Sequence, residues 1–195
     1  GASDALTVSP FQTWSAREEW LRRRLQQWTL RLIARRAPRR RLRAVDLGCG
    51  FGDFAARLAP LCADLTAVDF AAGFVEQARA RLVATAHPSA RAEQGDLRSY
   101  DRFADVDLVH LGAVCMYLED DELGRVYQRV RDRLRPDGVV VQREYVVVGL
   151  GREYLRDRGE YKSWQRRAHR YHALARHAGL TLVEQRRGPT IVMEE

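Results

Sequence analysis

The chain has 195 residues, 46% of them hydrophobic, and a net charge of +7 from 33 basic and 26 acidic side chains. This composition predicts one globular domain, and no run approaches the roughly 18 apolar residues of a membrane span. Three scattered cysteines without a CxxC pair argue against a disulfide framework or a metal site and favour a reduced, cytoplasmic protein.

A basic amphipathic segment comes before the first predicted strand. Residues 12–37 carry apolar side chains at helical spacing with arginines opposite, and Pro38 ends the predicted helix. The apolar stripe consists of Leu21, Leu25, Trp28 and Leu32, with Phe11, Trp14 and Trp20 before or beside it. A solvated arginine face is the preferred interpretation, and binding of phosphate or nucleic acid is the alternative.

Residues 44–54 hold three glycines at alternate positions, between an apolar run and a helical pattern. Gly48, Gly50 and Gly52 are more glycines than a tight turn needs. A loop of this kind before a helix binds ligands through backbone N–H groups and the helix dipole. A dinucleotide loop would have a further glycine where this chain has Asp53, whose charge disfavours a pyrophosphate. The loop therefore predicts a ligand less anionic than NAD.

Strands and helices alternate from Leu42 onward. The predicted strands are 43–47, 64–69, 91–94, 107–111 and 138–148, and the predicted helices are 53–60, 71–86 and 120–134. Such alternation indicates right-handed βαβ units and a mostly parallel sheet covered on both faces. Ligands of these sheets bind at the carboxyl ends of the strands, where Asp46, Asp69 and Asp96 fall.

The last part of the chain predicts a helix followed by a hairpin. Gly179 ends a helical stripe made of Trp164, Ala168, Tyr171, Ala175 and Ala178. Residues 181–187 and 190–194 are strand-like and are separated by Gly188-Pro189, which indicates an antiparallel pair at the sheet edge. The predicted fold class is α/β: a three-layer sandwich with a seven-stranded, mostly parallel sheet ending in an antiparallel hairpin, plus an N-terminal helix.

Five segments in order resemble the motifs of one enzyme family. Val-Asp-Leu-Gly-Cys-Gly-Phe-Gly at 45–52 resembles motif I of the class I S-adenosylmethionine (SAM) dependent methyltransferases. The later motifs are similar at 67–70, at 95–97, at 107–109 with 117–120, and at 134–138. The resemblance implies a single domain over 1–195, with a helix over the cofactor mouth (12–37) and a cofactor-binding core (42–148). A substrate linker (149–163) and the final helix and hairpin (164–195) would follow.

The resemblance also implies which residues bind SAM. Gly48, Gly50 and Gly52 would approach the methionine carboxylate, and Asp46 would orient the loop or reach the methionine amine through water. Asp69 would accept hydrogen bonds from the ribose hydroxyls, as one carboxylate can accept two. Phe70 would pack on adenine, Asp96 would accept from its amino group, and the Leu97 N–H would donate to its ring. Leu111 completes this expected set.

Methyl transfer requires a nucleophile held close to the activated methyl, and a base only if the nucleophile arrives protonated. Tyr117 stands where relatives often have a histidine, but its ordinary pKa of about 10 makes it a poor base. Tyr145 and His169 are the other residues expected to position substrate or accept a proton, with His172 nearby. The (Asn/Asp)-Pro-Pro-Tyr motif of the DNA and glutamine branches is absent.

The predicted function is transfer of a methyl group to a nitrogen or oxygen of a small molecule, because little chain is left to cover the site. A peptide N-terminus or an RNA is the alternative acceptor, the latter held by the basic N-terminal helix. From other classes, a non-catalytic SAM-binding protein and a nicotinamide-dependent oxidoreductase stay open.

Overall fold

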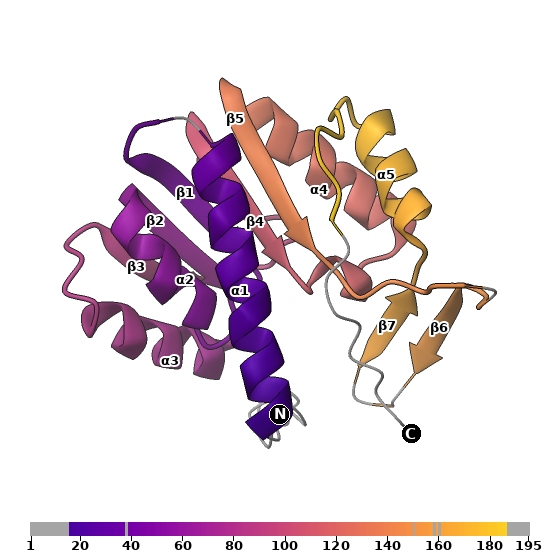
Figure 1. Cartoon of the computed structure of the whole chain (residues 1–195), viewed down its shortest axis with the longest axis horizontal. Coiled ribbons are helices and arrows are strands. Elements are labelled where there is room, and N and C mark those ends of the chain that lie inside the picture. The colour runs from indigo at the N-terminus through magenta and orange to yellow at the C-terminus, as the bar shows by residue number, and fades with distance from the viewer. Residues whose placement is uncertain (1–15, 38, 150, 158, 160, 187–195) are drawn as a thin grey trace.

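A five-stranded parallel sheet forms the centre of the molecule, with strand order β3-β2-β1-β4-β5 (Figure 1). The computed structural model describes residues 16–37, 39–149, 151–157, 159 and 161–186. The strands are β1 (Leu42–Leu47), β2 (Cys62–Asp69), β3 (Ala90–Gln94), β4 (Val106–Gly112) and β5 (Leu134–Arg143). The order reverses between β1 and β4, so the carboxyl ends of these two strands form a switch point where ligands bind.

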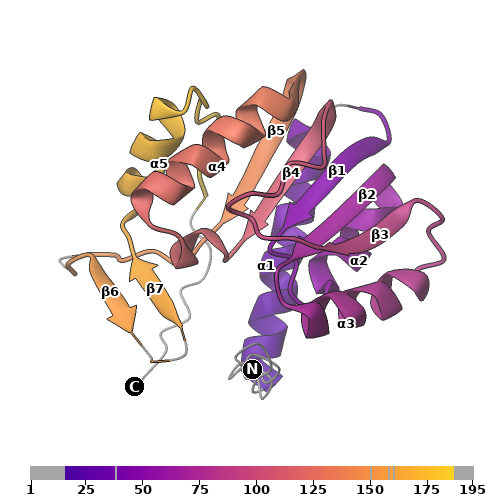
Figure 2. The same cartoon turned by 180° about the vertical axis from the view of Figure 1, so that it is seen from behind.

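Helices cover both faces of this sheet (Figures 1 and 2). One face packs against α1 (Ala16–Arg36), α2 (Asp53–Leu58) and α3 (Ala72–Val83), and short turns η2 (Ala59–Leu61) and η3 (Cys115–Tyr117) complete the connections. The other face packs against α4 (Asp120–Arg133) and α5 (Ala168–His177). Alternate strand residues serve the two cores, with Ala44 and Leu108 in the first and Val45 and Val109 in the second. The predicted parallel sheet with two covered faces is confirmed.

The predicted seven-stranded sheet with a hairpin at 181–194 is wrong for the described residues. The antiparallel pair is a separate two-stranded sheet formed by β6 (Tyr154–Asp157) and β7 (Lys162–Gln165), which we call the β6–β7 hairpin. Residues 181–186 contain no strand, since Leu182 and Val183 are exposed and bury nothing against the sheet. The predicted run at 190–194 lies outside the described residues.

One helix boundary and one strand boundary also differ from the prediction. Trp164 belongs to β7, where it pairs with Leu155, and α5 begins at Ala168 after Arg167 in extended conformation. The fifth strand ends at Arg143 and does not extend to residue 148.

The buried stripe of α1 lies about one residue away from the predicted one. Trp28 is 41% exposed, whereas Gln26, Thr29 and Ile33 are buried against the sheet. The buried Thr29 hydroxyl is satisfied, because it donates a hydrogen bond to the Leu25 carbonyl at 2.9 Å. Phe11 and Trp14 lie outside the described residues. Among the helices that the structure describes, none combines the length and apolarity needed to cross a bilayer.

Candidate cofactor and acceptor site

The glycine loop between β1 and α2 requires its glycines for two different reasons. Gly48, Gly50 and Gly52 all have positive φ, between 52° and 75°, which side chains rarely adopt. A Cβ on Gly52 would also lie 2.9 Å from Cα of Ala78 in α3, so this glycine permits helix packing. Nothing lies within 4 Å of a Cβ on Gly50, which leaves open space above the loop for a ligand.

Most of the loop N–H groups already have partners. Gly48 and Cys49 both donate to the Val68 carbonyl at the end of β2, at 2.8 and 3.0 Å, and Gly52 donates to Cys49 at 3.0 Å. These bonds hold the loop onto β2. Fewer loop N–H groups than predicted are therefore available to bind a carboxylate, because those of Gly48, Cys49 and Gly52 already donate to backbone carbonyls.

Asp69 anchors the same loop from the end of β2. Its Oδ2 accepts from the Gly50 N–H at 2.9 Å, and its Oδ1 accepts from the Ala71 N–H at 3.1 Å. Burial raises the pKa of this carboxyl. Each oxygen keeps a further lone pair, so Asp69 fits the expected acceptor for two ribose hydroxyls.

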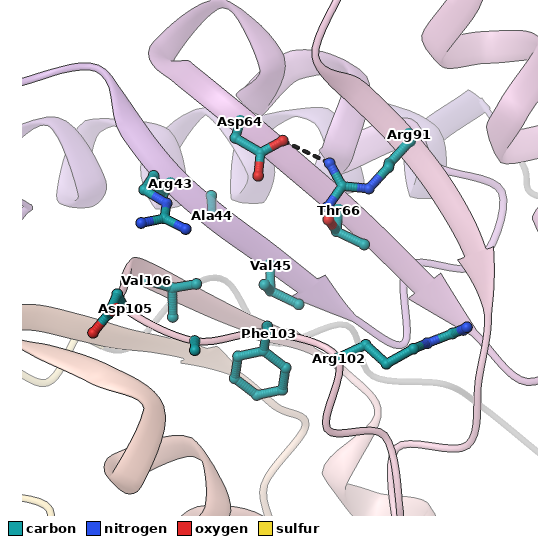
Figure 3. A pocket seen from close by; sticks show the side chains of 11 residues that line it. Arg43, Ala44, Val45, Asp64, Thr66, Arg91, Arg102, Phe103, Asp105 and Val106 are labelled. Atoms are coloured by element: carbon teal, nitrogen blue, oxygen red, sulfur yellow. Dashed lines mark hydrogen bonds and ion pairs between the residues drawn. The ribbon is translucent and has the colours of Figure 1, made fainter.

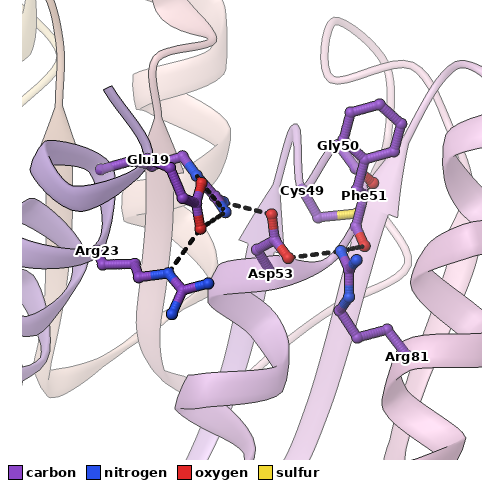
Figure 4. A network of polar contacts seen from close by, with 8 residues as sticks. Glu19, Arg23, Cys49, Gly50, Phe51, Asp53 and Arg81 are labelled. Atoms are coloured by element: carbon purple, nitrogen blue, oxygen red, sulfur yellow. Dashed lines mark hydrogen bonds and ion pairs between the residues drawn. The ribbon is translucent and has the colours of Figure 1, made fainter. Parts of the chain in front are cut away.

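An ion-pair network ties three helices together around the loop (Figure 4). Asp53, in the first turn of α2, pairs with Arg22 of α1 and with Arg81 of α3, the latter at 2.6 Å. Arg81 also donates to the Phe51 carbonyl at 2.7 Å, and Arg22 pairs with Glu19 at 2.8 Å. Two guanidinium groups thus offset the Asp53 charge, and its clearest role is to fix α1 and α3 beside the loop.

The residues predicted for adenine lie at the ends of β2 and β3. The Phe70 ring is 56% exposed and is free to cover a ligand. The Asp96 carboxylate accepts from the Arg98 N–H at 2.8 Å and from its guanidinium at 3.0 Å. Although partial burial acts to raise it, these Arg98 hydrogen bonds lower the pKa of Asp96. Leu97 is buried in the core on the α4 face, so only its backbone could contact adenine.

The other two predicted cofactor residues, Leu111 and Asp46, have buried side chains. The Leu111 side chain is fully buried in the core beneath α4, which leaves only its backbone to face a ligand. Asp46 is also buried, and its Oδ1 lies 2.7 Å from Nδ1 of His110 on β4. His110 was not predicted as a site residue. The signal that could have found it is a single imidazole within the apolar run of β4.

The predicted acceptor residues are only partly brought together. The Tyr117 ring packs edge-on against Tyr161, with centroids 5.9 Å apart. Burial, followed by the effect of Tyr161, Glu144 and Tyr145, raises the pKa of Tyr117 to about 12, so the phenol stays protonated at neutral pH and cannot accept a proton. Tyr145 is half-buried just after β5, whereas His169 is exposed in the first turn of α5. In the described part of the chain, no hydrogen bond or ring contact joins His169 to either tyrosine.

Glu144, the residue after β5, is a candidate site residue that the sequence analysis did not single out. Its Oε1 accepts from the Cys115 N–H at 2.9 Å, and its Oε2 is buried without a partner among the described residues. Burial raises the pKa of Glu144 to about 7. The signal was its position in the Arg-Glu-Tyr segment at the carboxyl end of the fifth strand.

Two cavities lie away from the glycine loop. One of about 380 Å³ lies between the start of α4 and the β6–β7 hairpin, and it is lined by Glu119, Asp120, Asp121, Glu153, Trp164, Arg166 and Arg170. The other, of about 210 Å³, lies at the amino ends of β1 and β2, beside Arg43, Thr66 and Phe103 (Figure 3). This cavity is therefore away from the carboxyl ends of the strands, where the predicted cofactor residues lie.

Comparisons with known proteins also indicate a methyltransferase domain. Residues 44–138 match a family described as "Methyltransferase domain", and no curated protein matches the chain. A proposed O-methyltransferase from Nostoc punctiforme PCC 73102 superposes with a TM-score of 0.70 at 14% identity, over 86% of this chain and 53% of that one.

Two further solved structures are described as N-methyltransferases. Phosphoethanolamine N-methyltransferase 1 from Haemonchus contortus, in complex with phosphoethanolamine and S-adenosylhomocysteine, is 26% identical over 64% of this chain and 27% of its own, with a TM-score of 0.55. NodS from Bradyrhizobium japonicum WM9, with S-adenosylhomocysteine, is 23% identical over 63% of this chain and 61% of its own, with a TM-score of 0.57. The chain thus spans about half the length of the Nostoc structure and about a quarter of the Haemonchus one.

Proposed function

We propose that this chain, which belongs to the class I SAM-dependent methyltransferases, transfers a methyl group to an amine nitrogen of a small molecule. SAM is the cofactor of this family, and it supplies a methyl group activated by the sulfonium. The chain's own residues must then hold the cofactor, position the acceptor and remove a proton from it.

The residues proposed to hold SAM line the carboxyl ends of β1 and β2. Open space above Gly50 admits a ligand close to the backbone, and Asp69 keeps lone pairs for the ribose hydroxyls. The exposed Phe70 ring is available to cover adenine. For Asp96 to accept from the adenine amino group, it must share its carboxylate with Arg98.

The observation that carries the choice of an amine is the Glu144 carboxyl. An amine arrives protonated at neutral pH and must lose a proton before it can attack. A buried carboxyl with a pKa of about 7 and one oxygen without a partner is suited to accept that proton. Tyr117, whose pKa is raised in part by Glu144 and Tyr145, would supply an aromatic wall together with Tyr145. The structurally similar proteins include both O- and N-methyltransferases, so the choice of an amine rests on Glu144.

The test compares amine and hydroxyl acceptors with radiolabelled SAM, using the native chain and Glu144→Gln. We expect amines to be labelled, with kcat rising through about pH 7, and Glu144→Gln to lower kcat by about 100-fold while the Kd for SAM stays within about twofold. Asp132→Asn, which removes an exposed acid of α4, is the control and should leave kcat unchanged. Labelling of hydroxyl acceptors alone, or full activity in Glu144→Gln, would contradict the proposal.

The exposed face of α1 favours RNA as a second candidate acceptor. Trp20 and Trp28 are 55% and 41% exposed. Arg24 lies between them in the sequence, and its guanidinium carbon is 5.0 Å from the centroid of the Trp20 ring. Aromatic rings interleaved with arginines are typical of single-stranded nucleic-acid binding. Fluorescence anisotropy with labelled single-stranded RNA would test this. Binding that weakens steeply with salt and is lost in a Trp20→Ala, Trp28→Ala double variant would support an RNA acceptor, and salt-independent or absent binding would exclude it.

A further inference from the structure

A buried pair of side chains joins the first and fourth strands directly below the glycine loop. Asp46 and His110 are register partners on β1 and β4, and their side chains are each 2% exposed. Asp46 Oδ1 and His110 Nδ1 lie 2.7 Å apart. The second oxygen of Asp46 and the second ring nitrogen of His110 are buried without partners in the described part of the chain. Buried polar atoms without partners are rare in folded proteins and call for an explanation.

The His110 ring is fixed from two sides. The Phe54 ring of α2 stacks on it, with centroids 3.9 Å apart and an interplanar angle of 29°. On the strand side, a Cβ on Gly112 would lie 2.5 Å from Cε1 of the imidazole, so glycine at this position leaves the ring its space. His110 is thereby held with Nδ1 toward Asp46.

Asp46 lies close to the glycine loop that is predicted to face the cofactor. Burial raises the pKa of the Cys49 thiol, and the Asp46 and Asp69 carboxylates raise it further, which places both acids near the loop. The two carboxylates create a negative potential at the end of β1. A cationic group is the partner that such a potential favours, and SAM carries an ammonium on its methionine moiety.

We propose that His110 is a positioning residue, which orients the Asp46 carboxylate so that Oδ2 is left for the ammonium group of the cofactor. His110 satisfies one oxygen, and the ligand satisfies the other. The inference rests on SAM binding within the proposed function, and it is independent of the acceptor and of Glu144.

The test measures binding of two ligands by calorimetry in the absence of any acceptor. S-adenosylhomocysteine contains the amino-acid moiety, and 5′-methylthioadenosine lacks it. We expect His110→Phe, which keeps the aromatic stack, to weaken S-adenosylhomocysteine by about tenfold or more and 5′-methylthioadenosine by less than about twofold. His110→Asn, whose amide can donate in place of Nδ1, should recover most of the loss, and Asp46→Asn should match His110→Phe. Equal weakening of both ligands, or weakening of neither, would overturn the proposal.

A measurement on the unaltered chain covers the case in which a variant does not fold. The imidazole nitrogens of His110, observed by ¹⁵N NMR, should shift on addition of S-adenosylhomocysteine and stay unchanged with 5′-methylthioadenosine, with exposed His177 as the internal control. Equal shifts with both ligands would refute the positioning role. If the native chain binds neither SAM nor S-adenosylhomocysteine, the proposed function itself fails, and this result is distinct from a failure confined to His110.

Discussion

Arg166 and Asp120, 46 residues apart, join the region after the β6–β7 hairpin to the first turn of α4. Arg166 Nε donates to Asp120 Oδ1 at 2.8 Å, and the rest of its guanidinium donates to the Cys115 carbonyl at 3.2 Å and the Leu118 carbonyl at 2.6 Å. The Arg166 side chain is 3% exposed. One buried guanidinium therefore satisfies two carbonyls of the segment that carries Tyr117 and the Asp120 carboxylate at the start of α4.

We expect Arg166→Ala to lower the free energy of unfolding by about 2–4 kcal/mol, because it leaves two carbonyls without their donor and removes a buried guanidinium from Asp120. Arg170→Ala is the matched control. Arg170 binds the other oxygen of Asp120 from a half-exposed position, so its loss should cost less than about 1 kcal/mol. Urea denaturation of both variants measures the difference, and equal losses would show that the buried bonds contribute little.

Alanine substitutions at two glycines of the loop should have different effects on stability and on SAM binding. Gly52→Ala combines a positive φ with a contact at 2.9 Å to the α3 backbone, and we expect a loss of about 3 kcal/mol in stability. Gly50→Ala meets no neighbour, so it should cost about 1–2 kcal/mol while blocking the ligand's approach and weakening SAM binding. Thermal melts and calorimetry with SAM separate the two effects. The prediction is wrong if Gly50→Ala binds SAM normally.

Asp69 and Asp96 should differ in their importance for SAM. Asp69→Asn alters an acid that holds the loop and is expected to accept the ribose hydroxyls, so we expect a loss in affinity of about tenfold or more. Asp96→Asn changes a carboxylate already occupied by Arg98, and about a threefold loss is expected. Calorimetric titration with SAM and S-adenosylhomocysteine gives both values. A larger effect at Asp96 would assign it the dominant contact.

Glu144 should make stability depend on pH in a defined window. Its pKa in the folded chain is about 7, above the ordinary 4.5, so the folded state binds the proton more tightly than the unfolded state. The contribution of Glu144 to stability is then largest below about pH 4.5, declines as the pH rises to about 7, and is constant above, with a total change on the order of 1–3 kcal/mol. Glu144→Gln should lack this decline. Unfolding free energies of both chains from pH 4.5 to 8 measure it, and parallel curves would exclude a raised pKa at Glu144.

The parts of the fold that follow from local sequence were predicted correctly. The glycine loop, the strands beside it and α4 lie within βαβ units, in which apolar runs and glycines directly specify the local structure. The site contacts that were missed join distant residues: His110 meets Asp46 across 64 positions, and Glu144 meets Cys115 across 29. No spacing rule predicts which register a parallel strand adopts, so these pairs are visible only in the fold.

The β6–β7 hairpin was misplaced for a different reason. Residues 154–157, Tyr-Leu-Arg-Asp, show no clear alternation of apolar and polar side chains and are largely exposed. Their strand conformation depends on pairing with β7 and on the Arg166 anchor, which are tertiary effects. Leu182 and Val183, by contrast, have strand propensity but no sheet to cover.

The cofactor loop and the β6–β7 hairpin are held by separate sets of contacts. The loop is fixed by β2 and by the Asp53 network, whereas the hairpin region is fixed by Arg166 to η3 and α4. A change in the segment at 154–165 should therefore leave the contacts of the glycine loop unchanged. Under the proposed function, the residues that would hold the methyl donor and the segment beside the acceptor are therefore stabilised independently of each other.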